Sequence, residues 1–446
     1  MSRATIRKTC EALVERLKNS DNGIKKKRLR KNFSSGQVKK LTLSPNKPFL
    51  DLTNCDKSSL YLLQECLNTV CQVNSDGMLS VLLKATALVD YATEKLHSYP
   101  YKDVPLCWRR LYTDASLIKS LCEIFVTLKK ENEIESWKQI IKTLDMALIM
   151  TGAPGINRKE MIFNLIGEVE KIMKDIEYEK DFITLAEFPM KRQIDKDVEK
   201  FEKRVKLENK VENMPIIRFP ISKMSSPSLV AFASHINTPN PTPFILTSCI
   251  SHWPALSTNP WADLDYLLSV TGKGRIVPVE IGAKYTDDSW SQKLMKFEEF
   301  VENRVKNPIK DEGIAYLAQH DLFAQIPRLK EDISIPDYCF VDTKPYLVSS
   351  NNIQYNPPPD VIINAWFGPR GTISPMHTDP YNNLLAQVVG QKYIRLYAPF
   401  ETSKVYPFEQ GSFLGNTNLE RFPLFASANY LECVLEPGDL LYIPVS

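Results

Sequence analysis

The chain is 446 residues long, with 43% hydrophobic and 24% charged residues, which is typical of a globular protein of two or three domains. No apolar run reaches the roughly 18 residues of a membrane span, and no apolar leader follows Met1, so we expect neither membrane insertion nor secretion. The formal net charge of +3 is unevenly divided, because residues 1–50 carry +11 and the remainder carries −8.

The first predicted segment, residues 1–50, is a basic and largely disordered tail. Its densest cluster, residues 25–31 (KKKRLRK), is too polar to fold alone and is typical of a nuclear-import signal. The alternative is a solvated tail whose charge only aids solubility. We expect nuclear localisation, with a cytoplasmic pool also compatible, and no direct contact with nucleic acid beyond this tail. Nine cysteines without a C-x-x-C motif fit a reducing compartment.

Residues 55–180 are predicted to form an all-α domain. Only six of the 30 prolines lie before residue 213, and apolar residues in this half recur at helical spacing. The apolar stripes comprise Leu60, Leu63, Leu67, Val70; Leu117, Leu121, Ile124; Trp137, Ile140, Leu144, Ala147; and Ile162, Leu165, Val169, Ile172. These stripes predict amphipathic helices that pack on one another and form the core of the domain.

A charged connector is expected over residues 181–212, followed by a strand-rich domain over residues 213–446. From Ile216 onward, short runs of β-type residues alternate with turns rich in proline, asparagine and glycine. The order of elements predicts an α+β chain, with a helical domain followed by a β-sandwich or barrel-like domain.

A candidate metal site lies in residues 371–379 (GTISPMHTD). In an extended segment, positions i and i+2 point to one face, so His377 and Asp379 can hold one cation together. Two histidines and a carboxylate on one face are typical of non-haem Fe(II) oxygenases, and this segment supplies two of those three ligands. By itself, the tripeptide is more typical of an ordinary surface strand end or turn than of a metal site. Lys392 follows after a turn at Gly390, on a strand from which it could pair with the far carboxylate of a dicarboxylate ligand.

From about residue 80 to the end, the chain resembles the JmjC family of Fe(II)/2-oxoglutarate oxygenases. Besides the His377/Asp379 pair, the motifs that carry it are 103–112 (DVPLCWRRLY), 251–255 (SHWPA), 276–282 (IVPVEIG), 285–292 (YTDDSWSQ), 316–323 (YLAQHDLF), 360–369 (DVIINAWFGP), 392–397 (KYIRLY) and 437–444 (PGDLLYIP). The resemblance implies a cupin-like double-stranded β-helix that uses Fe(II), 2-oxoglutarate and O2.

The resemblance also assigns roles to residues. It implies that His377 and Asp379 bind iron and that Lys392 pairs with the far carboxylate of 2-oxoglutarate. The other residues that it places at the 2-oxoglutarate site are Tyr316, Trp366, Ser374 and Asn383.

In the family, the pattern continues past the position of Val445 into a segment that contains an aromatic residue and a histidine. In this chain, that segment would come after the last residue. We therefore expect the third iron ligand and the last strands to be absent from this chain, and the 446-residue chain to bind Fe(II) weakly. The remaining histidines are interpreted as surface or core residues; they are His97, His235, His252 and His320.

The resemblance places Glu280, Tyr285 and Trp290 along the substrate groove. A carboxylate beside aromatic rings suits a guanidinium, so the sequence favours arginyl C3-hydroxylation of a protein or peptide. One alternative is demethylation of methyl-lysine in histones, which would make chromatin proteins partners. The other is a catalytically inactive binding module that lacks the third iron ligand.

Overall fold

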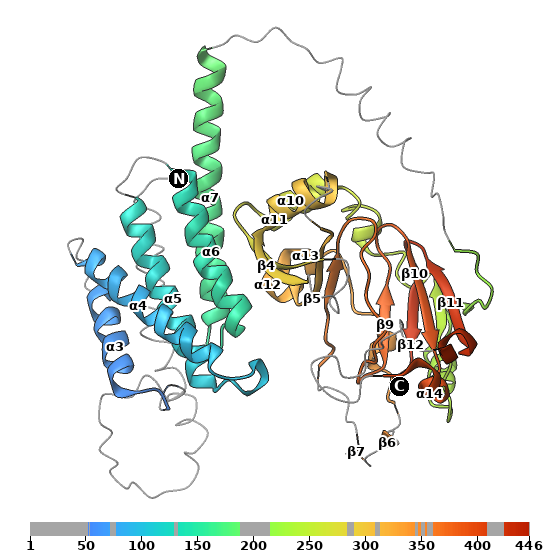
Figure 1. Cartoon of the computed structure of the whole chain (residues 1–446). Coiled ribbons are helices and arrows are strands. Elements are labelled where there is room, and N and C mark those ends of the chain that lie inside the picture. The colour runs from blue at the N-terminus through green and yellow to red at the C-terminus, as the bar shows by residue number, and fades with distance from the viewer. Residues whose placement is uncertain are drawn as a thin grey trace, which may run out of the picture. The chain divides into compact units, whose positions relative to one another are not determined.

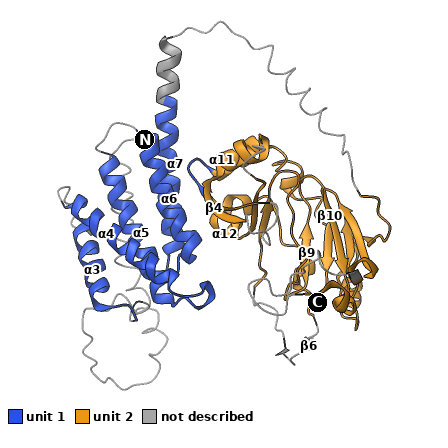
Figure 2. Cartoon of the chain, in the orientation of Figure 1, with its two compact units in different colours: residues 1–191, 272–276 blue, residues 192–271, 277–446 orange. Residues whose placement is uncertain are grey.

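The computed structural model describes residues 52, 54–71, 77–128, 133–187, 215–282, 290–307, 313–343, 347–348, 353–354, 360–407 and 423–445. The chain divides into two compact units (Figure 1, Figure 2). The first comprises residues 1–191 and 272–276, and the second comprises residues 192–271 and 277–446. Over the described ranges, no helix combines the length and the apolar character needed to cross a membrane.

The first unit is built from helices that share one apolar core. They are α3 (Lys57–Cys71), α4 (Met78–His97), α5 (Leu106–Thr127), α6 (Ile134–Thr151) and α7 (Arg158–Glu187). Helix α5 packs against α3, α4, α6 and α7, so most of its residues are buried. The four stripes predicted from helical spacing lie in this core. Helix α7 continues to Glu187, past the expected end of the helical domain at residue 180.

Helix α4 carries a further apolar stripe, which was not among the predicted ones. Its buried face is lined by residues that recur at intervals of three or four, namely Met78, Val81, Ala85, Leu88, Ala92 and Leu96. Helix α6 ends where Gly152 adopts a left-handed conformation, with φ of 71°, and donates its N–H to the Leu148 carbonyl at 2.9 Å.

Charged groups are buried within the first unit, and each carboxylate has cationic partners. Asp114 accepts hydrogen bonds from Arg110 Nε at 2.9 Å and from Arg158 Nε at 2.7 Å. Asp145 accepts hydrogen bonds from Arg275, the closest at 2.8 Å, and from the backbone N–H of Ile276. The segment 272–276, although it follows residue 271 of the second unit, therefore belongs to the helical unit.

Within the described residues, the second unit carries four sheets. One four-stranded sheet has strand order β1-β2-β12-β9 and the other has order β4-β3-β5-β8, while β10-β11 and β6-β7 are two-stranded. The strands are β1 (Ser222–Ser225), β2 (Phe244–Thr247), β3 (Ile276–Ile281), β4 (Ser291–Lys296), β5 (Ala315–His320), β6 (Leu347–Val348), β7 (Ile353–Gln354), β8 (Ala365–Phe367), β9 (Asn383–Ala386), β10 (Lys392–Tyr397), β11 (Tyr430–Leu435) and β12 (Leu440–Ile443). Between and beside them lie the short helices α9 (Leu229–Ile236), α10 (Leu264–Thr271), α11 (Phe297–Phe300), α12 (Leu322–Gln325), α13 (Pro327–Lys330) and α14 (Thr402–Val405). The order of helices and then strands agrees with the predicted α+β class.

The apolar residues of this unit are divided among several cores, and the space between strands β5, β8, β9, β10 and β12 remains open as one broad pocket. Strand β12 pairs on one side with β2 and on the other with β9, so β9 is an edge strand of the β1-β2-β12-β9 sheet. Strand β10 pairs along its whole length with β11. The candidate site is built from these strands and from the loop that precedes β9.

Candidate active site

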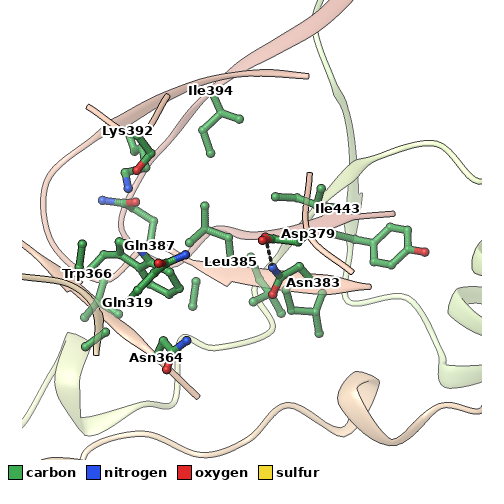
Figure 3. Close-up of a pocket in the computed structure, with 18 of the residues that line it drawn as sticks. Gln319, Asn364, Trp366, Asp379, Asn383, Leu385, Gln387, Lys392, Ile394 and Ile443 are labelled. Carbon is green, nitrogen blue, oxygen red and sulfur yellow. Dashed lines mark hydrogen bonds between the residues drawn. The ribbon is translucent and has the colours of Figure 1, made fainter. Parts of the chain in front are cut away.

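Lys392 and Tyr316 form a hydrogen-bonded pair in this pocket. Lys392 opens β10, and its Nζ donates to the hydroxyl oxygen of Tyr316 on β5 at 3.0 Å. Side chains alternate along a strand, so Lys392 shares a face with Ile394, and both are drawn as pocket-lining residues in Figure 3. An ammonium group has three donors and Tyr316 uses one of them, so Lys392 can also bind an anion. Within the described ranges, no carboxylate is recorded as an ion-pair partner of Lys392.

His377 and Asp379 lie together in the loop before β9, which has no regular strand structure. The His377 Nε2 atom is 3.7 Å from Asp379 Oδ1. His377 Nδ1 lies 2.7 Å from the carbonyl oxygen of Pro375. A carbonyl oxygen can only accept, so Nδ1 carries the hydrogen and, in the neutral ring, Nε2 keeps its lone pair for a metal. The structure therefore brings the two side chains together, although the segment that carries them is not paired in a sheet.

The geometry of this pair fits a shared metal ion. Two ligand atoms that each lie about 2.1 Å from an ion cannot be more than about 4.2 Å apart, and the observed separation is 3.7 Å. The His377 side chain is 34% exposed and that of Asp379 is 45% exposed, so both can be reached from the pocket. Among the described residues, no cluster of three or more histidine, cysteine or acidic side chains suited to a metal is present.

Asn383, the first residue of β9, forms a hydrogen bond with the candidate metal ligand Asp379. Its Nδ2 donates to Asp379 Oδ2 at 2.9 Å, as the dashed line in Figure 3 shows. The sequence placed Asn383 at the 2-oxoglutarate site but gave no sign of this contact. The carbonyl of Pro375 is likewise a functional group that the sequence did not single out, because its role depends on how the loop folds.

Trp366 and Ser374 also line the pocket. Trp366 lies on β8 and is 40% exposed, and Figure 3 shows it in the same pocket as Lys392 and Asp379. Ser374 lies in the loop that carries His377, and its side chain is exposed. Both residues therefore line the same pocket as His377 and Lys392, and neither side chain has a hydrogen bond within the described part of the chain.

Glu280 lies opposite Tyr316, because β3 and β5 pair antiparallel with these two residues in register. Residues directly opposite each other in such a pair project to the same face, and both line the pocket. Burial raises the pKa of the Glu280 carboxyl, and the neighbouring Trp290 indole N–H offsets part of this rise. The Trp290 Nε1 atom is buried without a hydrogen bond of normal geometry in the described part of the chain, so this contact is weak. Tyr285 lies outside the described residues.

Amide side chains are a feature of the pocket that the sequence did not indicate. Figure 3 shows Gln319, Asn364 and Gln387 there together with Trp366. Gln319 has a φ of 50°, in the left-handed region, and lies where the pairing of β5 with β8 shifts register between Leu317 and His320. A bulge of this kind cannot be recognised from the residue types of the segment 316–323.

The other histidines lie apart from this pair. His320 contacts Gln325, His252 contacts Ser334, and His235 contacts Thr242. His97 is an exposed residue in the last turn of α4. Each has the surface or core environment that the sequence predicted, and none is part of a three-ligand cluster among the described residues.

Comparisons with known proteins show the family of the chain. Residues 231–446 match the family of cupin-like domains. The chain is 38% identical over 372 residues to lysine-specific demethylase 8 of Danio rerio. The aligned residues cover 81% of this chain and 82% of the relative. The protein of the same name from Xenopus tropicalis is 35% identical over 400 residues, covering 80% of this chain and 83% of the relative.

A third relative, Jumonji C domain-containing protein 5 of Drosophila melanogaster, is 45% identical over 234 residues, which cover 50% of this chain and 54% of that protein. These matches confirm both the resemblance inferred from the motifs and the predicted fold class, with a helical region followed by a strand-rich cupin-like domain. The chain therefore belongs to the JmjC family of 2-oxoglutarate-dependent oxygenases.

Proposed function

We propose that this chain is an Fe(II)- and 2-oxoglutarate-dependent oxygenase of protein side chains, and that it hydroxylates arginine at C3. The observation that carries the proposal is that two kinds of site share one pocket. His377 and Asp379 offer a nitrogen and an oxygen to a metal, while Lys392 and Tyr316 offer donors to an anion. This combination suits a metal-chelating dicarboxylate such as 2-oxoglutarate.

Each residue has a defined task in this proposal. His377 and Asp379 would hold Fe(II), and the Pro375 carbonyl keeps the His377 ring in the tautomer that can bind it. Lys392 and Tyr316 would hold the far carboxylate of 2-oxoglutarate through charge-assisted hydrogen bonds. With O2, the bound iron and 2-oxoglutarate supply an oxidation that is coupled to release of succinate and CO2. The protein supplies position and restricts water, and Trp366 forms part of the pocket wall.

Glu280 supports arginine as the substrate residue. Its carboxylate lies in the same pocket and is partly desolvated, since burial raises its pKa. A partly desolvated carboxylate attracts a cation more strongly than an exposed one does, and a guanidinium can bind it through two parallel hydrogen bonds. A methylated ammonium has fewer donors and is usually bound by several aromatic rings instead.

Demethylation of methyl-lysine is the second candidate, because relatives with 38% and 35% identity are named lysine-specific demethylase 8. In that case, histones and other chromatin proteins would be the partners. Both candidates use the same iron and 2-oxoglutarate sites and differ only in the substrate side chain. A binding module without turnover is the third possibility.

The deciding experiment supplies the purified chain with Fe(II), 2-oxoglutarate and two matched sets of peptides, one containing arginine and the other containing methyl-lysine. Mass spectrometry would detect a gain of one oxygen atom on arginine or the loss of a methyl group from lysine, and succinate would be measured in parallel. Oxygen gain on arginine supports the proposal. Methyl loss alone would show that the chain is a methyl-lysine demethylase. The absence of both succinate and product would favour the binding module.

Replacing Glu280 with glutamine is expected to raise the KM for an arginine peptide by about 10- to 100-fold, which corresponds to the loss of a hydrogen bond to a charged group. The KM for 2-oxoglutarate should change little. In the parent chain, peptide binding requires ionised Glu280, so it should weaken as the pH falls through the raised pKa of this carboxyl. The E280Q variant should lack this pH dependence. Glu299→Gln, on α11 outside the pocket, is the matched control, and an unchanged peptide KM in E280Q would contradict the arginine proposal.

We also propose that the cluster at residues 25–31 directs the protein to the nucleus; this cluster lies outside the described residues. Replacing Lys25, Lys26, Lys27, Arg28 and Arg30 with alanine should move a tagged chain from nucleus to cytoplasm, because import receptors read such basic clusters. Fluorescence microscopy measures the distribution, with Lys39 and Lys40 replaced by alanine as the control. Unchanged nuclear fluorescence would leave the tail with a role in solubility only.

A further inference from the structure

We propose that Asn383 is a positioning residue that orients Asp379 for the metal, in addition to the place at the 2-oxoglutarate site that the family resemblance gives it; this inference rests on the proposed metal site. The two carboxylate oxygens of Asp379 have different neighbours. Oδ1 lies 3.7 Å from His377 Nε2, on the side where a shared ion would bind. Oδ2 accepts the hydrogen bond from Asn383 Nδ2 at 2.9 Å. Asn383 thus holds one oxygen and leaves the other for the ion (Figure 3).

The anchoring of Asn383 explains why it can act as a fixed point. It pairs with Ile443 in the register of β9 with β12, and β12 pairs in turn with β2. The preceding residue, Asn382, accepts hydrogen bonds from the Tyr442 hydroxyl at 2.9 Å and from the Val445 N–H at 3.1 Å. Asp379, in contrast, lies in the loop without regular structure. The hydrogen bond therefore connects a candidate metal ligand on a loop to a strand of the β1-β2-β12-β9 sheet.

The chemistry of the amide also suits this role. An ionised carboxylate can only accept hydrogen bonds, so the nitrogen of the Asn383 amide faces Asp379. The amide is neutral, and it restricts rotation of the carboxylate without cancelling the negative charge that attracts Fe(II). A lysine or arginine at position 383 would make a stronger contact but would compete with the metal for the same carboxylate. An asparagine is the side chain that orients Asp379 and leaves its charge available.

The test measures metal binding in the absence of 2-oxoglutarate, because a residue that contacts only the co-substrate would not affect that equilibrium. Mn(II) is titrated into the full 446-residue chain and into Asn383→Leu, which has a similar size but no donor, and electron paramagnetic resonance reports free Mn(II). We expect the Kd for Mn(II) to rise by about 10-fold, the lower end for outer contacts of metal ligands, because Asp379 is 45% exposed. Asn383→Gln, which keeps the amide donor, should recover part of the affinity.

Two controls separate the possible outcomes. Gln387→Leu removes a pocket amide whose recorded hydrogen bond goes to the Val389 carbonyl, so its Mn(II) affinity should equal that of the parent. His377→Ala and Asp379→Ala should abolish specific binding. An Asn383→Leu chain that binds Mn(II) as tightly as the parent overturns the positioning role, while parent binding that persists in both ligand variants overturns the proposed metal site itself. Thermal unfolding without metal verifies that each variant is folded.

Discussion

Replacing Lys392 with alanine is expected to raise the 2-oxoglutarate concentration needed for half-maximal turnover by about 100-fold. This corresponds to about 3 kcal/mol, the upper range for a hydrogen bond to a charged group in a partly buried site. The far carboxylate would lose its cationic partner and retain the Tyr316 hydroxyl, which now accepts a hydrogen bond from Lys392 at 3.0 Å. The measurement is succinate release as a function of 2-oxoglutarate concentration, at saturating Fe(II).

Two companion variants make this result specific. Tyr316→Phe removes only the hydroxyl and should raise the same requirement by about 10-fold, in line with the loss of one hydrogen bond. Lys223→Ala removes a lysine of β1 whose side chain is 55% exposed and lies outside the pocket, so it should leave the requirement unchanged. If Lys392→Ala needs no more 2-oxoglutarate than the parent does, Lys392 is a strand-end charge without a role in co-substrate binding.

Together with the Asn383 variants, these variants distinguish residues that bind 2-oxoglutarate from residues that affect metal binding. Loss of Lys392 should change the requirement for 2-oxoglutarate but not the affinity for Mn(II) measured alone. Loss of Asn383 should change the affinity for Mn(II) first. The two residues lie at the starts of different strands, β10 and β9, and the structure records no hydrogen bond between them. Independent effects on the two ligands are therefore expected.

The helical stripes show how much of the fold was predictable from the sequence. Leu117, Leu121 and Ile124 were selected only by their spacing, and all three are buried on α5. The spacing is informative because a helix places residues three and four apart on the same face. Helix α4 carries the same signal in Met78, Val81 and Leu88, so its buried face also follows from the spacing of apolar residues.

Contacts between distant residues could not be predicted in this way. Arg275 and Asp145 are 130 residues apart in the chain, and no local pattern indicates that the segment around Arg275 joins the helical unit. In the pocket, the motifs placed His377, Asp379 and Lys392 in one site, because family motifs record which residues converge. They did not record the Asn383–Asp379 contact or the Pro375 carbonyl, since both depend on the path of a loop.

Replacing Asp114 with alanine is expected to destabilise the helical unit by about 3–5 kcal/mol, the usual cost of breaking a buried ion pair by removing one partner. Asp114 is 2% exposed and is shared by Arg110 on its own helix and by Arg158 at the start of α7. Without the carboxylate, two guanidinium groups that are each at least 97% buried lose an anionic partner. The segment between α6 and α7 packs tightly against Arg110, since a Cβ at Gly155 would clash with the guanidinium group of Arg110.

Urea unfolding followed by circular dichroism at a helix-sensitive wavelength measures this effect, because most of the long helices belong to the first unit. Asp114→Asn keeps the shape of the side chain and removes the charge, so it separates the loss of the ion pair from the loss of packing. Lys171→Ala, which removes an exposed pair with Glu168 on α7, should leave the unfolding midpoint almost unchanged. If Asp114→Ala shifts the midpoint no further than Lys171→Ala does, the two arginines are stabilised by their other contacts. The buried charge network would then contribute little to the stability of the helical unit.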